Sequence, residues 1–248
     1  MKRRWSRPTR STLVGACWAA GITLATASYL ALIYPTLPDG LPVRYMRGEP
    51  VFFQVKTPLV VMLPSLVQMA LLLTFGAIGL LLLWRARPDT IDSASEADSA
   101  RMRLAVQGVA LLGAVWITVQ ALGAARLVAV WQGGRGGFGR VYNIAVLISL
   151  VVSTVIVWRT MRAVRQEGPS AAEVDPSMWR FSNLYFNPLD PSLFVPTRRG
   201  VGWTLNFGRP LAIILIAGVL IVGIGGPFLL ARAVLWNGAF AMLRIGPP

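Results

Sequence analysis

The residues of this chain that could do chemistry are ten carboxylates and one thiol, since the sequence contains no histidine. The carboxylates are Asp39, Glu49, Asp89, Asp92, Glu96, Asp98, Glu167, Glu173, Asp175 and Asp190. Acid–base catalysis needs a positioned pair of tuned groups, and nucleophilic catalysis needs a base beside the nucleophile. All ten carboxylates lie between the apolar runs, and residues 89–98 have the Ser- and Ala-rich composition of a solvated linker. The sequence therefore predicts neither an enzyme nor a metal or cofactor site.

Two other segments resemble functional motifs but lack residues that such motifs need. Residues 133–139 read GGRGGFG, without the Lys-Ser or Lys-Thr that ends a phosphate-binding loop. A flexible turn is favoured here over a backbone nest for an anion. Cys17 is the only cysteine and lies within an apolar run, so it is expected to pack and to form no internal disulfide.

The elements that must position these residues are long apolar runs. Hydrophobic residues make up 55% of the 248 residues and charged residues only 14%, with a mean hydropathy of +0.60. A helix of roughly 20 residues crosses the hydrocarbon core of a bilayer. Five runs are long enough: residues 13–34, 58–84, 104–131, 141–158 and 211–231. The fold class predicted is an all-α polytopic membrane protein with about five transmembrane helices and a small cytosolic β-hairpin insertion.

Basic residues indicate how the runs are oriented. With the N-terminus in the cytoplasm, most of the 24 basic residues fall in segments on the cytoplasmic side. Cytoplasmic loops of membrane proteins carry an excess of Lys and Arg, so we expect the N-terminus inside and the C-terminus outside. Topology and contact with the lipid bilayer then explain the net charge of +14, and no nucleic-acid partner is expected.

The first run is interpreted as an uncleaved membrane span. A basic segment precedes it, and Ala25-Thr26-Ala27 has the form of a signal-peptide cleavage site. The apolar run nevertheless continues to Tyr34, which is long enough for a full crossing.

These assignments divide the chain into segments. Residues 1–12 form a basic cytosolic N-terminus, residues 13–84 a first helix pair with an external Pro-rich loop at 35–57, and residues 85–103 a cytosolic linker. Residues 104–158 form a second helix pair with an external Gly-rich loop at 132–140. Residues 159–210 are cytosolic and include a small hairpin domain at 175–210. The last helix covers residues 211–231, and residues 232–248 form an external tail.

The loop at residues 35–57 is predicted to hold one shape, because four prolines between residues 35 and 50 restrict its backbone. It resembles the loop of the SdpI-like family of bacterial membrane proteins, whose pattern is near YPxLPxxxPxHxxxxGxP. Arg44 stands at that family's histidine position, and Lys56 matches a lysine before the second helix. The sequence leaves two alternative roles for this loop, an external recognition surface or a rigid cap between two helices. The candidate recognition residues are Tyr34, Pro35, Leu37, Pro38, Pro42, Arg44, Tyr45, Arg47, Gly48, Glu49 and Pro50.

The second segment with a distinctive pattern is NPLDPSLFVPTRRGVGWTLNFGRP, residues 187–210. Its turn dipeptides and period-two alternation predict that residues 193–196 and 203–207 pair as antiparallel strands. The segment resembles a short cytosolic domain of unknown function found in bacterial membrane proteins. It is interpreted either as a self-contained platform with an aromatic core or as a partner surface. The residues of that candidate cytosolic surface are Asn187, Asp190, Arg198, Arg199, Trp203 and Asn206.

Together the resemblances imply a non-enzymatic, multi-pass protein of the bacterial cytoplasmic (inner) membrane. It would sense, or give immunity to, a peptide or envelope signal and relay it to a cytosolic protein at the hairpin. An external peptide ligand and a homo-oligomer are further expected partners. The alternative is a transporter or an accessory subunit of a larger membrane complex. Against transport, polar residues inside the runs, such as Gln68 and Gln107, are expected to bond between helices.

Overall fold

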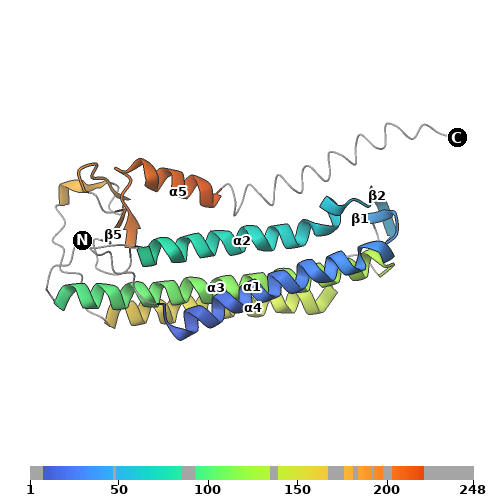
Figure 1. The fold of residues 1–248 in the computed structure, drawn as a ribbon, viewed down its shortest axis with the longest axis horizontal. Helices are drawn as coiled ribbons and strands as arrows, with labels where there is room; N and C mark the ends of the chain where they lie inside the picture. Colours follow the sequence, from blue (N-terminus) through green and yellow to red (C-terminus); the bar gives the residue numbers. More distant parts are fainter. Residues whose placement is uncertain are drawn as a thin grey trace. The chain divides into compact units, whose positions relative to one another are not determined.

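The computed structural model describes residues 8–46, 49–84, 93–134, 139–166, 176–180, 184–190, 193–197 and 203–220. Its helices are α1 (Arg10–Ile33), α2 (Pro58–Trp84), α3 (Ser93–Trp131), α4 (Gly139–Gln166) and α5 (Pro210–Leu220), with short 3-10 turns η1 (Tyr34–Thr36) and η2 (Pro176–Met178). Its strands are β1 (Gly40–Met46), β2 (Glu49–Val55), β3 (Trp179–Arg180), β4 (Leu184–Tyr185), β5 (Phe194–Pro196) and β6 (Trp203–Leu205). Figure 1 shows the long helices and the small strand pairs.

Four helices in the described part are long and apolar enough to cross a membrane: Arg10–Thr36, Pro58–Leu83, Ala100–Trp131 and Gly139–Val164. They correspond to the first four runs predicted from the sequence and are consistent with a membrane protein. The fifth predicted run, residues 211–231, begins as α5, and its remainder lies outside the described residues.

The starts of the first two long helices follow from local sequence. Thr9 accepts a hydrogen bond at Oγ1 from the Thr12 amide, at 3.1 Å, and so caps α1. Thr57 does the same for the Val60 amide, at 3.3 Å, and Pro58 occupies the first helical position of α2, where its missing amide hydrogen is not needed.

Helix α3 begins at Ser93, inside the segment predicted as a linker at 85–103. Residues 93–103 contain no Gly or Pro, and their Ala, Glu, Met and Arg residues favour helix, so a hydrophilic composition alone does not interrupt it. Helix α4 likewise continues past the apolar run to Gln166. The apolar pattern therefore marks the part of a helix suited to lipid, and not its ends.

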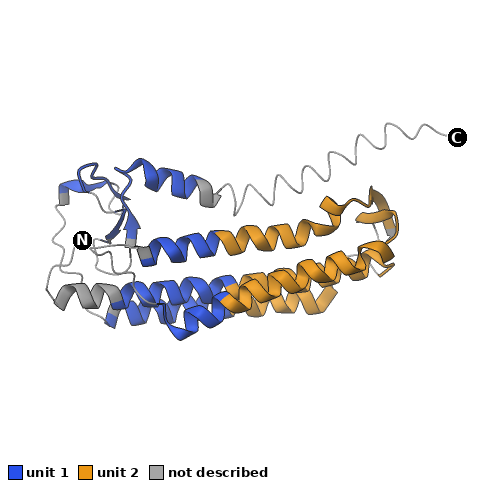
Figure 2. Ribbon diagram, in the orientation of Figure 1, with its two compact units in different colours: residues 1–16, 74–113, 152–221 blue, residues 17–73, 114–151, 222–248 orange. Residues whose placement is uncertain are grey.

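The chain divides into two compact units, each built from parts of the four long helices (Figure 2). Unit 1 comprises residues 1–16, 74–113 and 152–221, and unit 2 comprises residues 17–73, 114–151 and 222–248. The buried core of unit 2 is formed by Leu30, Leu37, Leu41, Val60, Val61, Val128 and Trp131. It joins α1, α2 and α3 to the β1–β2 hairpin.

In unit 1, small residues on α3 allow its neighbours to approach closely. A methyl group placed on Gly108 would lie 2.7 Å from Thr160 Oγ1 of α4, and one on Gly113 would lie 3.1 Å from the Phe75 ring of α2. Helices in membranes associate through such small-residue contacts and through interhelical hydrogen bonds.

Polar side chains within the spans bond between helices, as expected from the sequence. Gln68 of α2 is fully buried in unit 2 and donates from Nε2 to the Ile117 carbonyl of α3, at 3.1 Å. In unit 1, Gln107 of α3 accepts from Thr9 Oγ1 at 3.1 Å. These bonds satisfy the amide nitrogen of Gln68 and the amide oxygen of Gln107 within the helix bundle.

Candidate functional site

The segment predicted as a Pro-rich loop is mostly a β-hairpin. Strands β1 and β2 pair antiparallel, from Gly40 opposite Val55 to Met46 opposite Glu49. Residues 50–55 read PVFFQV, and the Val and Phe residues in this stretch favour a strand. The prolines of the segment obscured this signal in the sequence. The loop description was therefore wrong for residues 40–46 and 49–55, while its expected rigidity fits a paired hairpin.

The prolines are accommodated where the pairing tolerates them. Register shifts lie between Pro42 and Arg44 and between Arg44 and Tyr45, immediately after the proline that cannot donate to the ladder. In a sheet of two strands, both strands are edges, where proline is permitted.

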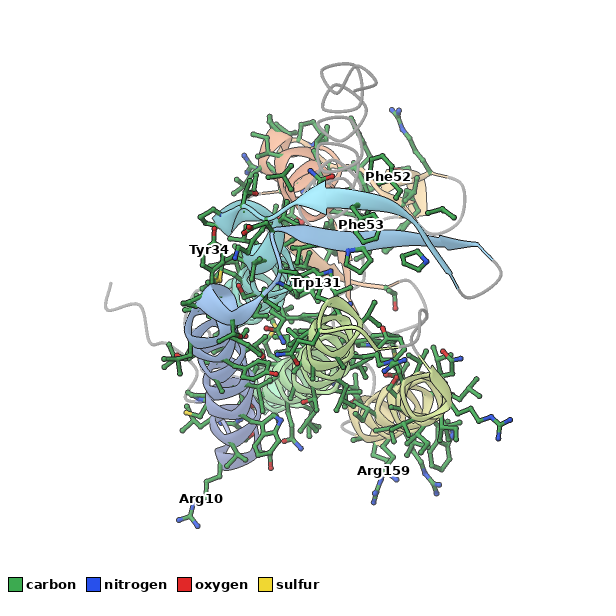
Figure 3. All side chains as sticks on the ribbon, turned by 90° about the vertical axis from the view of Figure 1, so that its right-hand side faces the viewer. Arg10, Tyr34, Phe52, Phe53, Trp131 and Arg159 are labelled. Atoms are coloured by element: carbon green, nitrogen blue, oxygen red, sulfur yellow. The ribbon has the colours of Figure 1, made fainter. Side chains whose placement is uncertain are left out.

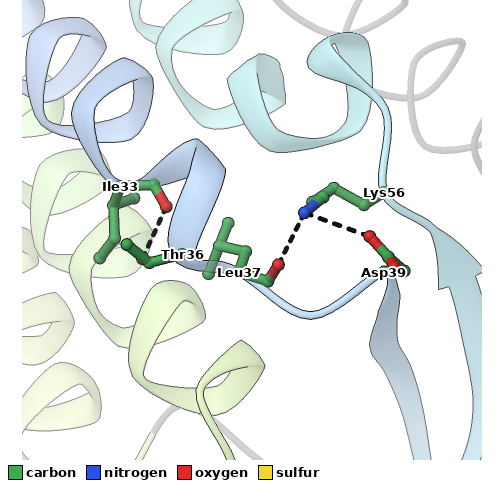
Figure 4. A network of polar contacts seen from close by, with 5 residues as sticks. All are labelled: Ile33, Thr36, Leu37, Asp39 and Lys56. Carbon is green, nitrogen blue, oxygen red and sulfur yellow. Dashed lines mark hydrogen bonds and ion pairs between the residues drawn. The ribbon is translucent and has the colours of Figure 1, made fainter.

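Lys56 joins the hairpin to the end of α1 (Figure 4). Its Nζ donates to the Leu37 carbonyl at 2.7 Å and lies 3.3 Å from Asp39 Oδ1. Its backbone amide donates to the Asp39 carbonyl at 2.7 Å, and Nζ lies 5.4 Å from the centroid of the Tyr34 ring. The Lys56 side chain is 14% exposed whereas that of Asp39 is 99% exposed, so the ion pair is screened by water. The charge-assisted bond to the carbonyl therefore contributes most of the anchoring.

The two faces of the hairpin differ. Leu41 and Gln54 are paired in the register and both are buried, so one face packs on the core of unit 2. On β2 the alternate residues Val51, Phe53 and Val55 are 46%, 54% and 60% exposed. Figure 3 shows Phe53 on the hairpin beside the half-buried Phe52. The outer face thus presents a row of three apolar side chains.

The candidate recognition residues do not form one exposed patch. Leu37 is 3% exposed and belongs to the core, and Pro42 is also buried, so neither is an accessible handle. Pro35, Pro38 and Pro50 are exposed, and Tyr34 is half-buried beside Lys56. The backbone of Arg44, Tyr45 and Glu49 lies in the strands; their side chains, and Arg47 and Gly48 entirely, lie outside the described residues. The apolar row on β2 was missed, because the apolar Phe52 between Val51 and Phe53 hides the alternation in the sequence.

The second candidate region is organised around Asn206, which is fully buried. Its Oδ1 accepts from the amides of Asn187 and Gly208, each at 3.0 Å. Its Nδ2 donates to the carbonyls of Asn187 at 2.8 Å and Asp190 at 3.2 Å. One side chain therefore bonds to four backbone groups and holds residues 187–190 against the end of β6.

Further bonds close this polar network. The Asn187 Oδ1 accepts from the amides of Leu189 and Asp190, which is the geometry of an Asx turn. Asp190 Oδ2 accepts from the Tyr185 hydroxyl at 3.1 Å, and the Asp190 carbonyl accepts from Arg209 Nε at 2.7 Å. The Asn187-Pro188 dipeptide thus marks a turn that the network secures.

This placement changes the interpretation of the proposed partner surface. Asn206 is inaccessible, and Asn187 and Asp190 use their side chains or carbonyls inside the segment, so these residues serve its folding. Arg198 and Arg199 lie outside the described residues, as does the side chain of Trp203. Within the described part, the most exposed large apolar side chain of the segment is Leu189, at 88%.

The predicted antiparallel pairing is confirmed, with Phe194 opposite Leu205, Val195 opposite Thr204 and Pro196 opposite Trp203. The connecting turn at residues 198–202 lies outside the described residues. The segment is not self-contained, however. A small core of Trp179, Tyr185 and Val195 is its own, whereas Phe194 packs against the helix cluster of Leu82, Met102 and Val106.

Among the described residues, no group of three or more His, Cys, Asp or Glu side chains could hold a metal ion. The described carboxylates Asp39 and Asp190 are engaged in the contacts given above. That the protein is not an enzyme stays a prediction.

Comparison with known proteins identifies one matching segment. Residues 188–213 match a family of unknown function (DUF5808). The match covers β5, β6, the first residues of α5, and Asp190, Asn206, Gly208 and Arg209 of the polar network, while Tyr185 and Asn187 lie just before it. No curated protein and no solved structure matches the chain. The matched segment is therefore similar to a family that has no assigned activity, and it contains Asn206, the residue at the centre of the polar network.

Proposed function

We propose that the protein is a multi-pass protein of the bacterial inner membrane, similar to SdpI-like proteins, that recognises an external peptide through the β1–β2 hairpin. The observation that carries the proposal is the row of Val51, Phe53 and Val55 on the outer face of a hairpin held by Lys56. Exposed apolar side chains on a rigid element favour an apolar partner, because little ordering is needed on binding.

The distribution of charge supports an orientation with the hairpin outside. Positive charge is concentrated in the segments placed in the cytoplasm, as the positive-inside rule requires. A relay to a cytosolic protein would then use exposed side chains of the matched segment, such as Leu189, and not Asn206.

Cysteine labelling is expected to place Asp39 outside and Leu189 inside. Both positions are highly exposed in the structure, so an introduced cysteine should react wherever reagent is present. In a Cys17→Ser background, which removes the only native thiol, a membrane-impermeant maleimide should label Asp39→Cys in intact cells. Leu189→Cys should react only after permeabilisation. Labelling of Leu189→Cys in intact cells would contradict the orientation.

Substitution of the apolar row is expected to abolish protection against a peptide. Cells lacking the protein would be challenged with membrane-active peptides, and protection by the restored wild type would be measured as survival. The double variant Phe53→Ser, Val55→Ser removes two exposed apolar side chains and should lose that protection at unchanged abundance. Reversing the charges at Arg44 and Arg47 should have the same effect if the turn contributes to recognition.

Val141→Ser is the matched control, because it makes the same kind of change at an exposed apolar residue of α4, outside both the hairpin and the matched segment. It should retain protection. Full protection by the Phe53→Ser, Val55→Ser variant would leave the hairpin as a cap between α1 and α2.

A further inference from the structure

Unit 1 contains an apolar cavity of about 560 Å³, between three long helices and the matched segment. The helices contribute Ile78, Leu82, Ala105, Thr160, Met161 and Val164. The strands, the turn after β6 and α5 contribute Leu184, Phe194, Thr204, Leu205, Phe207, Leu215 and Ile216. The volume falls in the range of cavities that hold small ligands.

The cavity lies at the ends of the apolar helix spans. Leu82 is one residue from the end of the α2 span, Ala105 is near the start of the α3 span, and Val164 is the last residue of the α4 span. Trp158, exposed on α4, and Arg162, whose guanidinium lies 5.5 Å from the Trp158 ring centroid, are residue types typical of the boundary between hydrocarbon and headgroups. The cavity is therefore placed where acyl chains meet the polar region.

The lining suits a hydrocarbon chain better than water. Apart from the hydroxyls of Thr160 and Thr204, the lining side chains carry no polar atoms. A water in such a cavity would find few hydrogen-bond partners, so an apolar ligand suits this lining better.

Charge around the cavity favours an anionic headgroup. Arg101 lies one helical turn before Ala105, and Arg209, whose Nε donates to the Asp190 carbonyl, lies two residues after Phe207. Of the carboxylates in unit 1, only Asp190 has a described side chain. Phosphate is bound well by arginine, which offers several donors in a planar group.

We propose that this cavity binds one acyl chain of an anionic phospholipid, with the phosphate held among these arginines. The lipid would fill the space between the helix ends and the DUF5808-like segment and so couple that segment to the bilayer. The inference needs the helices to be in a membrane but does not depend on peptide recognition by the β1–β2 hairpin.

The test uses the full chain in nanodiscs that contain phosphatidylglycerol with a diazirine near the end of one acyl chain. After photolysis, cross-links mapped by mass spectrometry should fall on cavity residues such as Met161, Leu205 and Leu215. Cross-links to Val151, which is exposed on α4, report ordinary surrounding lipid. The Ala105→Phe variant should lower cavity labelling roughly tenfold, since the ring displaces about two methylene groups, and should leave Val151 labelling unchanged.

Ala125→Phe is the matched control, because Ala125 is exposed on the same helix and lies outside the cavity. It should change neither set of cross-links. Size-exclusion chromatography in detergent checks that Ala105→Phe folds as the wild type does. If it does not, Ile216→Phe on α5 replaces it, since that ring fills the same cavity from another element. Wild-type labelling confined to Val151, or cavity labelling unchanged by both filling variants, would overturn the proposal. Equal cavity labelling from a phosphatidylcholine with the same acyl chain would contradict the inference that the bound lipid has an anionic headgroup.

Discussion

Replacing Asn206 with leucine is expected to unfold the DUF5808-like segment locally. The substitution leaves two amides, of Asn187 and Gly208, and two carbonyls, of Asn187 and Asp190, without the partners they have now. A buried polar group without a partner costs about 1–3 kcal/mol, and water can reach some of these part-buried groups. We therefore expect a loss of about 4 kcal/mol in the free energy of local opening.

Hydrogen exchange measures that loss directly. The amide of Phe207 donates to the Tyr185 carbonyl at 2.8 Å, so its exchange reports opening of the segment. A change of about 4 kcal/mol corresponds to exchange roughly a thousandfold faster, since each 1.4 kcal/mol is about a factor of ten. Asn143→Leu, the same substitution at an exposed position of α4, should leave this amide unchanged. Unchanged exchange in the Asn206 variant would show that the network does not stabilise the segment.

The helices were predictable because their signal is local and repeated. Each apolar run is long enough to be assigned from composition alone, and the four that lie within the described residues form the helices that could span a membrane. The pairing of β5 with β6 was predictable for a similar reason, since residues 203–207 alternate with period two. In both cases one physical signal acts over several neighbouring residues.

The β1–β2 hairpin was missed because two signals compete in the same stretch. Proline argues against a strand, while Val51, Phe52 and Phe53 favour one. The outcome depends on the partner strand, because proline is tolerated at an edge, and which strand is an edge cannot be read from one segment. Leu37 was wrongly predicted to be an accessible recognition residue for a related reason. It lies in a short connection after α1, and it is buried only because residues of α2 and α3 pack against it.

The roles of Asn206 and Phe194 could not be assigned by residue type. A polar residue in a strand pattern suggests an outer face, yet Asn206 points inward because its amide matches four backbone groups brought from residues 187–190 and 208. Phe194 suggests the core of a small platform, yet it packs on Leu82 and Met102 from distant helices. Both assignments depend on contacts far apart in the sequence, and therefore needed the fold.

Gly208 gives the sharpest steric prediction, because replacement by alanine should strongly destabilise the segment. A Cβ there would lie 2.5 Å from the Asn187 carbonyl carbon and 2.6 Å from the Pro188 nitrogen, both backbone atoms. Backbone in a turn fixed by Pro188 and by the Asn206 network cannot move aside as a flexible side chain can. Overpacking of this kind costs about 1–3 kcal/mol or more, and here it also separates the bonded pairs.

Gly21→Ala is the control that isolates this contact. Gly21 lies within α1 and has no atom within 4 Å of an added Cβ, so alanine there should stabilise the helix by up to about 1 kcal/mol. The same chemical change should therefore have opposite signs at the two glycines. Exchange at the Phe207 amide and the thermal midpoint in detergent would measure both. Equal behaviour of the two variants would contradict the close approach of residues 187–188 to Gly208, and with it the structural role of Asn187, Pro188 and Gly208 in the segment.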